Sequence, residues 1–313
     1  MASFSIGGAA SSGLSLIRER PVAVLIWGLA YFAIAVAPML LVGATAIPDF
    51  IKTMKLAGAE PGDDALMRMM VGLQAKMILL QSVQFLGAIA AAALIYSAVF
   101  RAVLEPHESR RWYLRLSAQE GWVAFVFVVT GVIGIIAMFA AMIPFGIIAA
   151  IIGAATGGQN PSAWLILVPI GLAVLGVVIW LILRLVLALP MSFAERNFRL
   201  FESWSLTKGH AGAMALTFLI VMVLFIVIEI VFVVIGAMAG GALVAASGVS
   251  FPSGGEFPKP PAMGWAPFAA IAIALLGLLY SLFAGVVHAI GVAPIAYIYR
   301  ELTAAKVVTA PGT

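Results

Sequence analysis

The chain contains no cysteine and few charged residues. None of its 313 residues is cysteine, which excludes disulfides and thiolate metal sites. Charged residues make up 10% of the chain, whereas soluble domains average about 25%. With 64% hydrophobic residues and a mean hydropathy of +1.16, this composition excludes an ordinary soluble fold and indicates an integral membrane protein.

Common catalytic and nucleic-acid-binding patterns are also missing from the sequence. It has no glycine-rich loop ending in Gly-Lys-Ser/Thr, no Gly-x-Ser-x-Gly and no His-Glu-x-x-His. The three histidines are far apart, and the net charge of +4 is spread over short segments instead of one basic patch. We therefore predict a protein without enzymatic activity that needs no cofactor or metal and binds no nucleic acid.

Long apolar runs dominate the sequence instead. A helix needs about 20 apolar residues to cross the hydrocarbon core, because its backbone groups must be hydrogen-bonded within the segment. We predict an all-α polytopic membrane protein, with residues 1–313 forming a single membrane domain. Its six transmembrane helices are expected near residues 22–46, 77–100, 122–152, 164–189, 212–246 and 266–298.

The first apolar run admits a second interpretation, because Arg18 and Arg20 precede it as basic residues precede the core of a secretory signal peptide. The run continues well past Pro38, however, and is longer than such a core. A retained transmembrane helix therefore fits better.

The distribution of basic residues predicts the orientation. Twelve Lys and Arg residues lie on the side of the two termini and five on the other side. Because basic residues near span ends are retained in the cytoplasm, segments 1–21 and 299–313 are expected to be cytoplasmic.

Two segments on the same side, 101–120 and 190–209, combine aromatic and basic residues, a composition typical of the headgroup layer. We predict that each forms an amphipathic interfacial helix. In the second segment, Pro190 and a Ser192/Glu195 capping box would begin a helix of about four turns. Candidate contacts with lipid or a partner are Arg110, Arg111, Trp112, Tyr113, Arg115, Arg196, Arg199, Trp204 and Lys208.

Capping signals also fall where the hydropathy predicts helix starts. Ser117 and Glu120 have capping-box spacing before the third run, and Asn160-Pro161 resembles the start of the fourth. Similar Arg-to-Pro stretches end the second and fourth spans, at 101–106 and 184–190, which suggests an internal parallel repeat.

Ionisable and amide side chains inside the spans form a second group of candidates. Glu229 lies deep in the fifth span, and His288 lies at a comparable depth in the sixth. Gln74, Gln81 and Gln84 share one face of the second span. These residues either hydrogen-bond between neighbouring helices or form a polar site for a substrate or proton.

Small residues and one basic residue complete the candidates for helix packing. The patterns Gly236 to Gly240 and Gly87 to Ala91 permit close helix approach, first within one subunit and second in a dimer. Arg184 is expected to snorkel to the interface or to pair with Glu195.

Several short motifs resemble a bacterial family of multi-pass proteins. They are Leu189-Pro190, Glu195, Ser205 to Gly209, and Tyr113 to Leu116 before Glu120. The family is the membrane domain of glycerophosphoryl diester phosphodiesterase, together with related inner-membrane proteins. There the phosphodiesterase chemistry belongs to a separate soluble barrel domain that this sequence does not contain. The resemblance therefore implies a bacterial inner-membrane location and no transferable activity.

These observations lead to two main functional hypotheses, and an intramembrane enzyme is a third, which would require several polar side chains to converge in one pocket. The first is a non-enzymatic inner-membrane protein that binds membrane lipid or a partner protein through its interfacial segments. The alternative is a transporter for a small or amphipathic solute, using a polar site around Glu229 and His288. A homo-oligomer is compatible with both.

Overall fold

A computed structural model describes residues 4–57, 63–107, 110–155, 162–249 and 264–309, and these residues contain helices and no strand. Six helical regions are long and apolar enough to cross a membrane, and each overlaps one predicted run. They are Pro21–Ala46, Met70–Leu104, Arg111–Ala155, Leu165–Glu195, Ala211–Ser247 and Pro267–Ala304. The prediction of an all-α polytopic membrane protein with six spans is confirmed.

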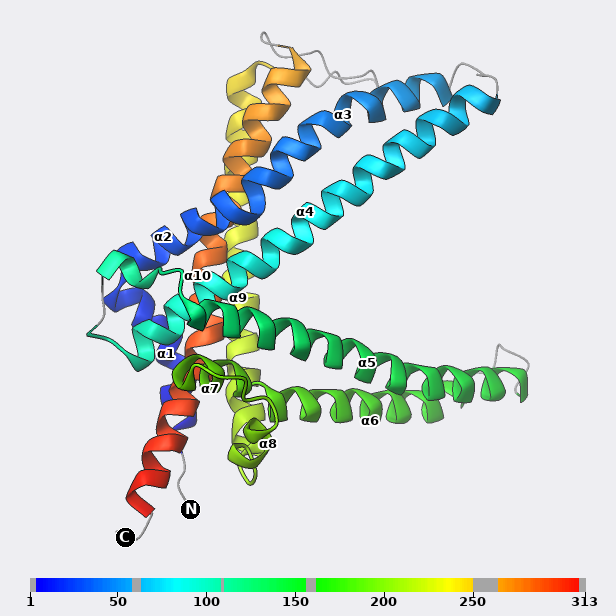
Figure 1. Ribbon diagram of the computed structural model, residues 1–313. Helices are drawn as coiled ribbons and strands as arrows, with labels where there is room; N and C mark the ends of the chain where they lie inside the picture. Colours follow the sequence, from blue (N-terminus) through cyan, green and yellow to red (C-terminus); the bar gives the residue numbers. More distant parts are fainter. Residues whose placement is uncertain (1–3, 58–62, 108–109, 156–161, 250–263, 310–313) are drawn as a thin grey trace.

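The long helices form three hairpins that diverge from one end of the molecule (Figure 1). The first hairpin is α3 (Ala37–Ala57) with α4 (Asp63–Leu104). The second is α5 (Ala118–Ala155) with α6 (Ser162–Leu185), and the third is α9 (Ala211–Ser247) with α10 (Trp265–Thr309). Both chain ends lie at the common end, from which the three hairpins extend in different directions.

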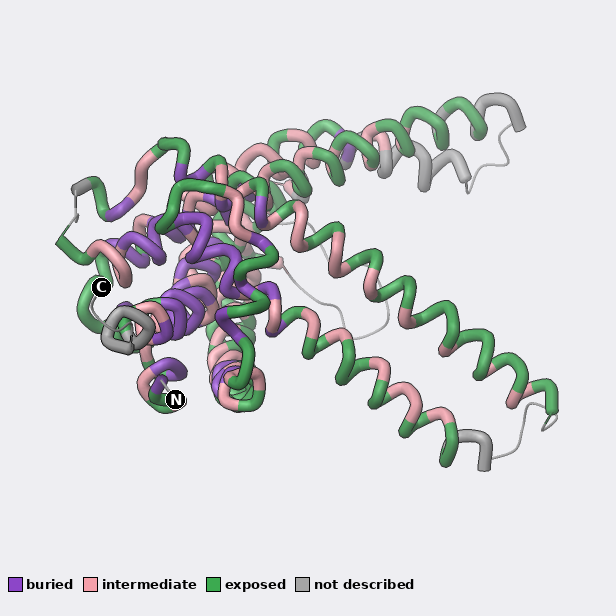
Figure 2. Tube along the Cα trace, turned by 60° about the horizontal axis from the view of Figure 1, so that its bottom comes forward, coloured by how far each residue is buried: buried purple, intermediate pink, exposed green. Residues whose placement is uncertain are grey.

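We call this common end the hub and define it as residues 4–36, 91–126, 183–221 and 281–304; the rest of the three hairpins are the arms. Among the described residues, every buried hydrophobic or polar side chain except Ala46 lies in the hub. Figure 2 shows the same division, with the buried residues concentrated where the hairpins meet. The tertiary structure is therefore held together at one end.

The predicted cytoplasmic segment 1–21 contains a helix that the sequence analysis did not predict. In α1 (Ile6–Glu19), the Ser5 hydroxyl accepts a hydrogen bond from the Gly8 N–H at 3.1 Å, which caps the helix. Its buried face comprises Ala9, Ala10, Gly13 and Leu16 and packs on α9 and α10. Small residues on this face allow α1 to lie close to α10.

Helices α2 (Pro21–Tyr31) and α10 approach each other closely at two glycines. A Cβ on Gly28 would lie 2.7 Å from the Leu282 Cα, and one on Gly285 would lie 2.6 Å from the Val24 carbonyl oxygen. Both distances are shorter than non-bonded atoms tolerate. Glycine at both positions therefore allows the two backbones to touch.

The two predicted small-residue patterns behave differently. A Cβ on Gly87 would lie 2.9 Å from the Ile34 carbonyl oxygen, in the π-helix η1 (Phe32–Val36) that joins α2 to α3, which confirms packing within the subunit. Gly236 and Gly240 lie in an arm, and no atom of the described residues lies within 4 Å of either Cβ position. The described part of the chain therefore gives no close helix approach at this second pair.

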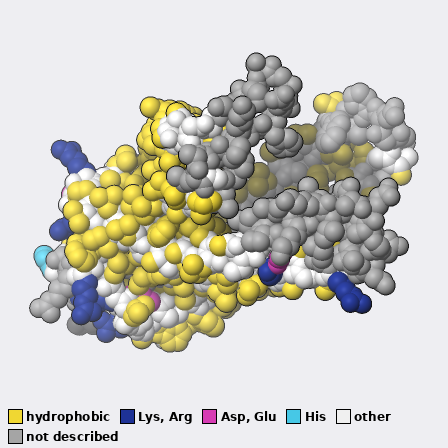
Figure 3. All heavy atoms as spheres, turned by 90° about the horizontal axis from the view of Figure 1, so that it is seen from above, with side chains coloured by type: hydrophobic (Ala, Val, Ile, Leu, Met, Phe, Trp, Pro, Cys, Tyr) yellow, Lys and Arg dark blue, Asp and Glu magenta, His cyan; other side chains and the backbone are white. Residues whose placement is uncertain are grey.

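Exposed side chains of the arms are mainly apolar. Hydrophobic side chains form most of the coloured surface in Figure 3, and Lys and Arg stand at its margins. Large exposed residues on α5, α6 and α9 include Phe139, Leu165 and Met238. A surface of this kind is stable against lipid hydrocarbon, where it makes the contacts that a soluble protein makes in its core.

Candidate functional site

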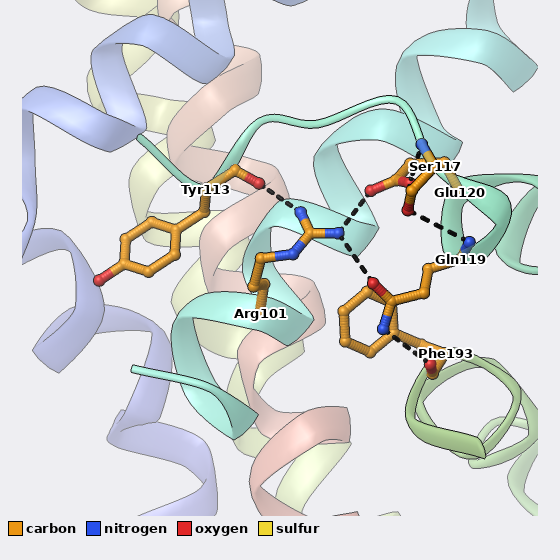
Figure 4. Close-up of polar contacts among 6 residues, drawn as sticks. All are labelled: Arg101, Tyr113, Ser117, Gln119, Glu120 and Phe193. Carbon is orange, nitrogen blue, oxygen red and sulfur yellow. Dashed lines mark hydrogen bonds and ion pairs between the residues drawn. The ribbon is translucent and has the colours of Figure 1, made fainter. Parts of the chain in front are cut away.

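A buried polar network occupies the centre of the hub (Figure 4). Arg101 on α4 is fully buried, and its Nη2 donates to Glu120 Oε1 at 2.6 Å and to Gln119 Oε1 at 3.3 Å. Its Nη1 donates to the Tyr113 carbonyl oxygen. The guanidinium also lies 5.3 Å from the Phe193 ring centroid. A buried arginine is thus matched by one carboxylate and several fixed acceptors.

The same network begins α5 and connects it to α7 (Ala188–Glu195). Glu120 accepts hydrogen bonds from the Ser117 backbone N–H, at 2.8 Å, and from the Ser117 hydroxyl, which confirms the predicted capping box. Gln119 Nε2 donates to the Phe193 carbonyl oxygen at 3.2 Å, and Phe193 belongs to α7. Sequence reasoning recognised the cap but missed Arg101, Gln119 and Phe193, because their partners are distant along the chain.

Segment 101–120 does not form the predicted interfacial helix, so that prediction is wrong. Helix α4 ends at Leu104, and a short 3₁₀ turn, η2 (Arg110–Tyr113), follows with φ values of +52° to +66° at residues 111–113. Tertiary hydrogen bonds fix this conformation. The Trp27 indole donates to the Trp112 carbonyl oxygen at 2.9 Å, Arg101 donates to that of Tyr113, and the Tyr113 ring is buried.

The single four-turn helix predicted over 190–209 is also wrong. Helix α7 ends at Glu195, the backbone turns left-handed at Arg196 with φ of +53°, and α8 spans only Glu202–Leu206. Ser192 does not cap a helix. Its buried hydroxyl accepts the Arg199 backbone N–H at 3.0 Å and closes the turn between the two short helices.

These two segments place most of the predicted contact residues on the hub surface. The exposed ones are Arg111, Trp112, Arg196, Trp204 and Lys208. Tyr113 is buried, Arg115 is half-buried, and Arg199 forms ion pairs with Glu195 at 2.8 Å and with Glu202 at 2.9 Å. For Arg110, the backbone is described but the side chain lies outside the described part. The structure also exposes Leu116, at 91%, and Phe201, at 71%, two apolar residues of these segments that were not among the predicted contacts.

Charge around the α7–α8 turn is partly neutralised. Arg199 lowers the pKa of Glu202 through a hydrogen bond to its carboxylate, and the two carboxylates raise the pKa of Arg199. Arg196 and Lys208 have no ion-pair partner among the described residues. These two side chains therefore carry the unbalanced positive charge of this surface.

A pocket of about 250 Å³ lies where α1 meets α2, against η2. Trp112 and Tyr113 form one wall, and the Arg20 guanidinium lies 6.0 Å from the Tyr113 ring centroid. The remaining lining residues are Glu19, Pro21, Val22 and Ala23. Since the pocket joins residues far apart along the chain, sequence analysis could not assemble it.

Intramembrane candidates are not brought together into one site. Glu229 is exposed on α9, without a hydrogen bond or ion pair to any described residue. His288 on α10 is half-buried; its Nδ1 lies 2.6 Å from the Ala284 carbonyl oxygen, and its ring packs between Tyr31 and Tyr96 at centroid distances of 5.5 and 5.7 Å. The exposed glutamines lie on a different arm, on α4, and are Gln74, Gln81 and Gln84.

No group of three or more His, Asp and Glu side chains within the described ranges could hold a metal ion. The chain matches no protein-family model, no curated protein and no solved structure. The resemblance to the phosphodiesterase membrane domain therefore stays a prediction, and the site must be interpreted from its own chemistry.

Proposed function

We propose that this integral membrane protein binds membrane lipid through the hub, on the cytoplasmic face of a bacterial inner membrane, without catalysing a reaction. The supporting observation is the exposure of large apolar side chains in the two hub segments that connect the long helices, 105–117 between α4 and α5 and 196–210 between α7 and α9. Leu116 and Phe201 are 91% and 71% exposed, and Trp112 is 50% exposed beside the exposed Arg111. Such side chains are unfavourable in water and favourable in the headgroup layer.

Chain topology supports a common location for these segments. Two spans separate the N-terminal helix from segment 105–117, and two more separate that segment from 196–210. An even number of crossings returns the chain to the same side of the membrane each time. The excess of Lys and Arg on this side supports a cytoplasmic location, where anionic headgroups attract basic side chains.

Transport has less support. The hypothesis depended on a polar site around Glu229 and His288, and the two residues have different surroundings, one exposed on α9 and one packed between tyrosines. A protein partner on the hub is the main competing explanation for the exposed aromatic side chains. Measuring bound lipid distinguishes protein binding from lipid binding.

The test is the amount of anionic phospholipid that remains bound to the purified protein in mild detergent, measured by native mass spectrometry. Trp112→Ala with Arg111→Gln should lower the occupancy of phosphatidylglycerol about fivefold, since one charge near an anionic surface contributes about 1 kcal/mol. Phe139→Ala is the matched control, because Phe139 is similarly exposed, at 56%, but lies on an arm.

Two results would contradict this proposal. One is unchanged lipid occupancy in the Trp112 and Arg111 variant, and the other is an equal loss in the Phe139 variant. If lipid occupancy is unchanged while a co-purifying protein is lost, the hub surface binds a protein instead.

A further inference from the structure

A second and larger pocket lies where α6 ends and α8 packs against it. It is an open depression with a volume of about 470 Å³. The pocket is lined by Arg184, Phe201, Trp204, Ser205 and Lys208. Two of its five residues are basic and none is acidic.

Aromatic stacking holds the Arg184 side chain in this pocket. The guanidinium carbon lies 5.3 Å from the Trp180 ring centroid and 5.6 Å from that of Trp204, and the two rings meet edge to face at 5.0 Å. The Ser203 hydroxyl donates to the Arg184 carbonyl oxygen at 2.7 Å, which attaches α8 to the end of α6. Arginine stacked on indole is oriented before any ligand arrives.

The positive charge of Arg184 has no acidic partner within the described part of the chain. The predicted pairing with Glu195 is wrong, because Glu195 forms its ion pair with Arg199. Nη1 of Arg184 makes only long hydrogen bonds, of 3.4 Å, to the Trp204 carbonyl oxygen and the Thr207 hydroxyl. Its Nε is buried and has no hydrogen-bond partner among the described residues. A guanidinium in this state favours a bidentate oxyanion.

The position of the pocket indicates where that oxyanion comes from. Arg184 is the second-last residue of α6, and Lys208 lies three residues before α9 begins at Ala211, so the pocket lies at the hub ends of these two long helices. Beyond the hub, α6 and α9 diverge (Figure 1), and their exposed side chains include the apolar Ile179, Ile182 and Met222. A headgroup in the pocket would therefore have apolar surface for its acyl chains close by.

We propose that this pocket binds the phosphate of an anionic phospholipid headgroup, with Arg184 and Lys208 supplying the positive charge. Trp180 and Trp204 act as positioning residues that hold the guanidinium at the pocket. This inference rests on the proposed function, and it assigns the lipid class and a site separate from Trp112 and Arg111.

The experiment compares occupancy by phosphatidylglycerol and by phosphatidylcholine, using native mass spectrometry of full-length protein released from nanodiscs that contain both lipids. Lys208→Gln and Arg184→Gln should each lower phosphatidylglycerol occupancy about fivefold and leave phosphatidylcholine unchanged. Arg18→Gln is the matched control, because Arg18 is an exposed basic residue of α1 outside the pocket. Lys208 is exposed, so its variant tests the proposal even when the Arg184 variant folds poorly.

The alternative outcomes separate this inference from the proposed function. If all three variants lose lipid equally, or if neither pocket variant loses any while the Trp112 and Arg111 variant does, the pocket assignment is overturned and hub lipid binding stands. If wild-type protein shows no preference between the two lipids and the Trp112 variant has unchanged lipid occupancy, both the pocket assignment and the proposed function are overturned. If glycerol phosphate at a concentration equal to the lipid displaces it, the ligand is a soluble phosphate ester and the lipid assignment is overturned.

Discussion

The hub and the arms are both built mainly from apolar helices, yet different interactions hold each region together. In the hub, glycines bring backbones into contact and a buried ion pair links α4 to α5. In the arms, the helices pack in pairs, and most of the side chains on their outer surface are apolar and exposed. Lipid is as apolar as leucine, so hydrophobicity places the arms in the membrane without specifying their packing.

The largest difference between the two regions should be their accessibility to a reagent that cannot cross the membrane. Because the chain has no cysteine, single-cysteine variants can be labelled with maleimide without background from native cysteines. Leu116→Cys in the hub and Ala246→Cys at the end of an arm are separated by three spans and should lie on opposite sides of the membrane. We expect a membrane-impermeant maleimide to label the Ala246 variant in intact spheroplasts and the Leu116 variant only after permeabilisation. Labelling of both variants in intact spheroplasts would contradict the proposed topology.

The next largest effect concerns ion pairs. Glu120→Ala should lower the free energy of unfolding by about 3–5 kcal/mol, because it leaves the buried Arg101 charge uncompensated. Asp49→Asn removes an ion pair with Lys76 in the first arm, where both side chains are more than a third exposed, and should cost less than about 1 kcal/mol. Denaturant unfolding in a mild detergent would measure both values.

A double replacement sharpens this comparison. Arg101→Met with Glu120→Leu should recover part of the stability lost in Glu120→Ala, because neither charge then remains buried and unpaired. Equal destabilisation by the Glu120 and Asp49 variants would show that the buried network is not specific to the hub.

Replacing glycine with alanine should change the stability of the protein by a smaller amount, and in opposite directions in the hub and in the arms. Gly28→Ala should destabilise the protein by about 1–3 kcal/mol, because the new Cβ would meet the Leu282 backbone of α10. Gly236→Ala lies in open space and should be neutral or stabilise by up to about 1 kcal/mol, because alanine favours helix more than glycine does. Thermal unfolding of the two variants measures the difference, and a destabilised Gly236 variant would instead indicate an unseen partner on that arm.

The smallest expected effect is pH dependence at the hub surface. Arg199 lowers the pKa of Glu202 in the folded protein, so this ion pair adds stability above the ordinary glutamate pKa of 4.5, which is lost as the pH falls through the lower folded pKa. The difference in melting temperature between wild type and Glu202→Gln should therefore be small near neutral pH and shrink in acid. An increase of that difference in acid would contradict the assignment.

The spans and the Ser117–Glu120 cap were predictable because hydropathy and capping depend on residues close in the chain. The interfacial helices over 101–120 and 190–209 were not, although their patterns are amphipathic. Hydrogen bonds from Trp27 and Arg101 fix the first segment in a non-helical conformation, and the Ser192 hydroxyl closes a turn in the second.

The candidate site shows the same division. Sequence composition identified Arg111, Trp112, Trp204 and Lys208 as interfacial, and the structure exposes all four. It could not identify the two pockets, because each is assembled from separate segments, nor the packing of Arg184 against both Trp180 and Trp204.

The sequence by itself determined that this chain is a six-span helical membrane protein, because the hydrocarbon core admits only long apolar helices with satisfied backbones. Only the tertiary structure decided which ends of those helices meet and which basic residues form ion pairs with a carboxylate. Arg101 forms an ion pair with Glu120, whereas Arg184 lines a pocket without a carboxylate partner among the described residues. The two arginines differ because α5 supplies a carboxylate to Arg101 and no described segment supplies one to Arg184.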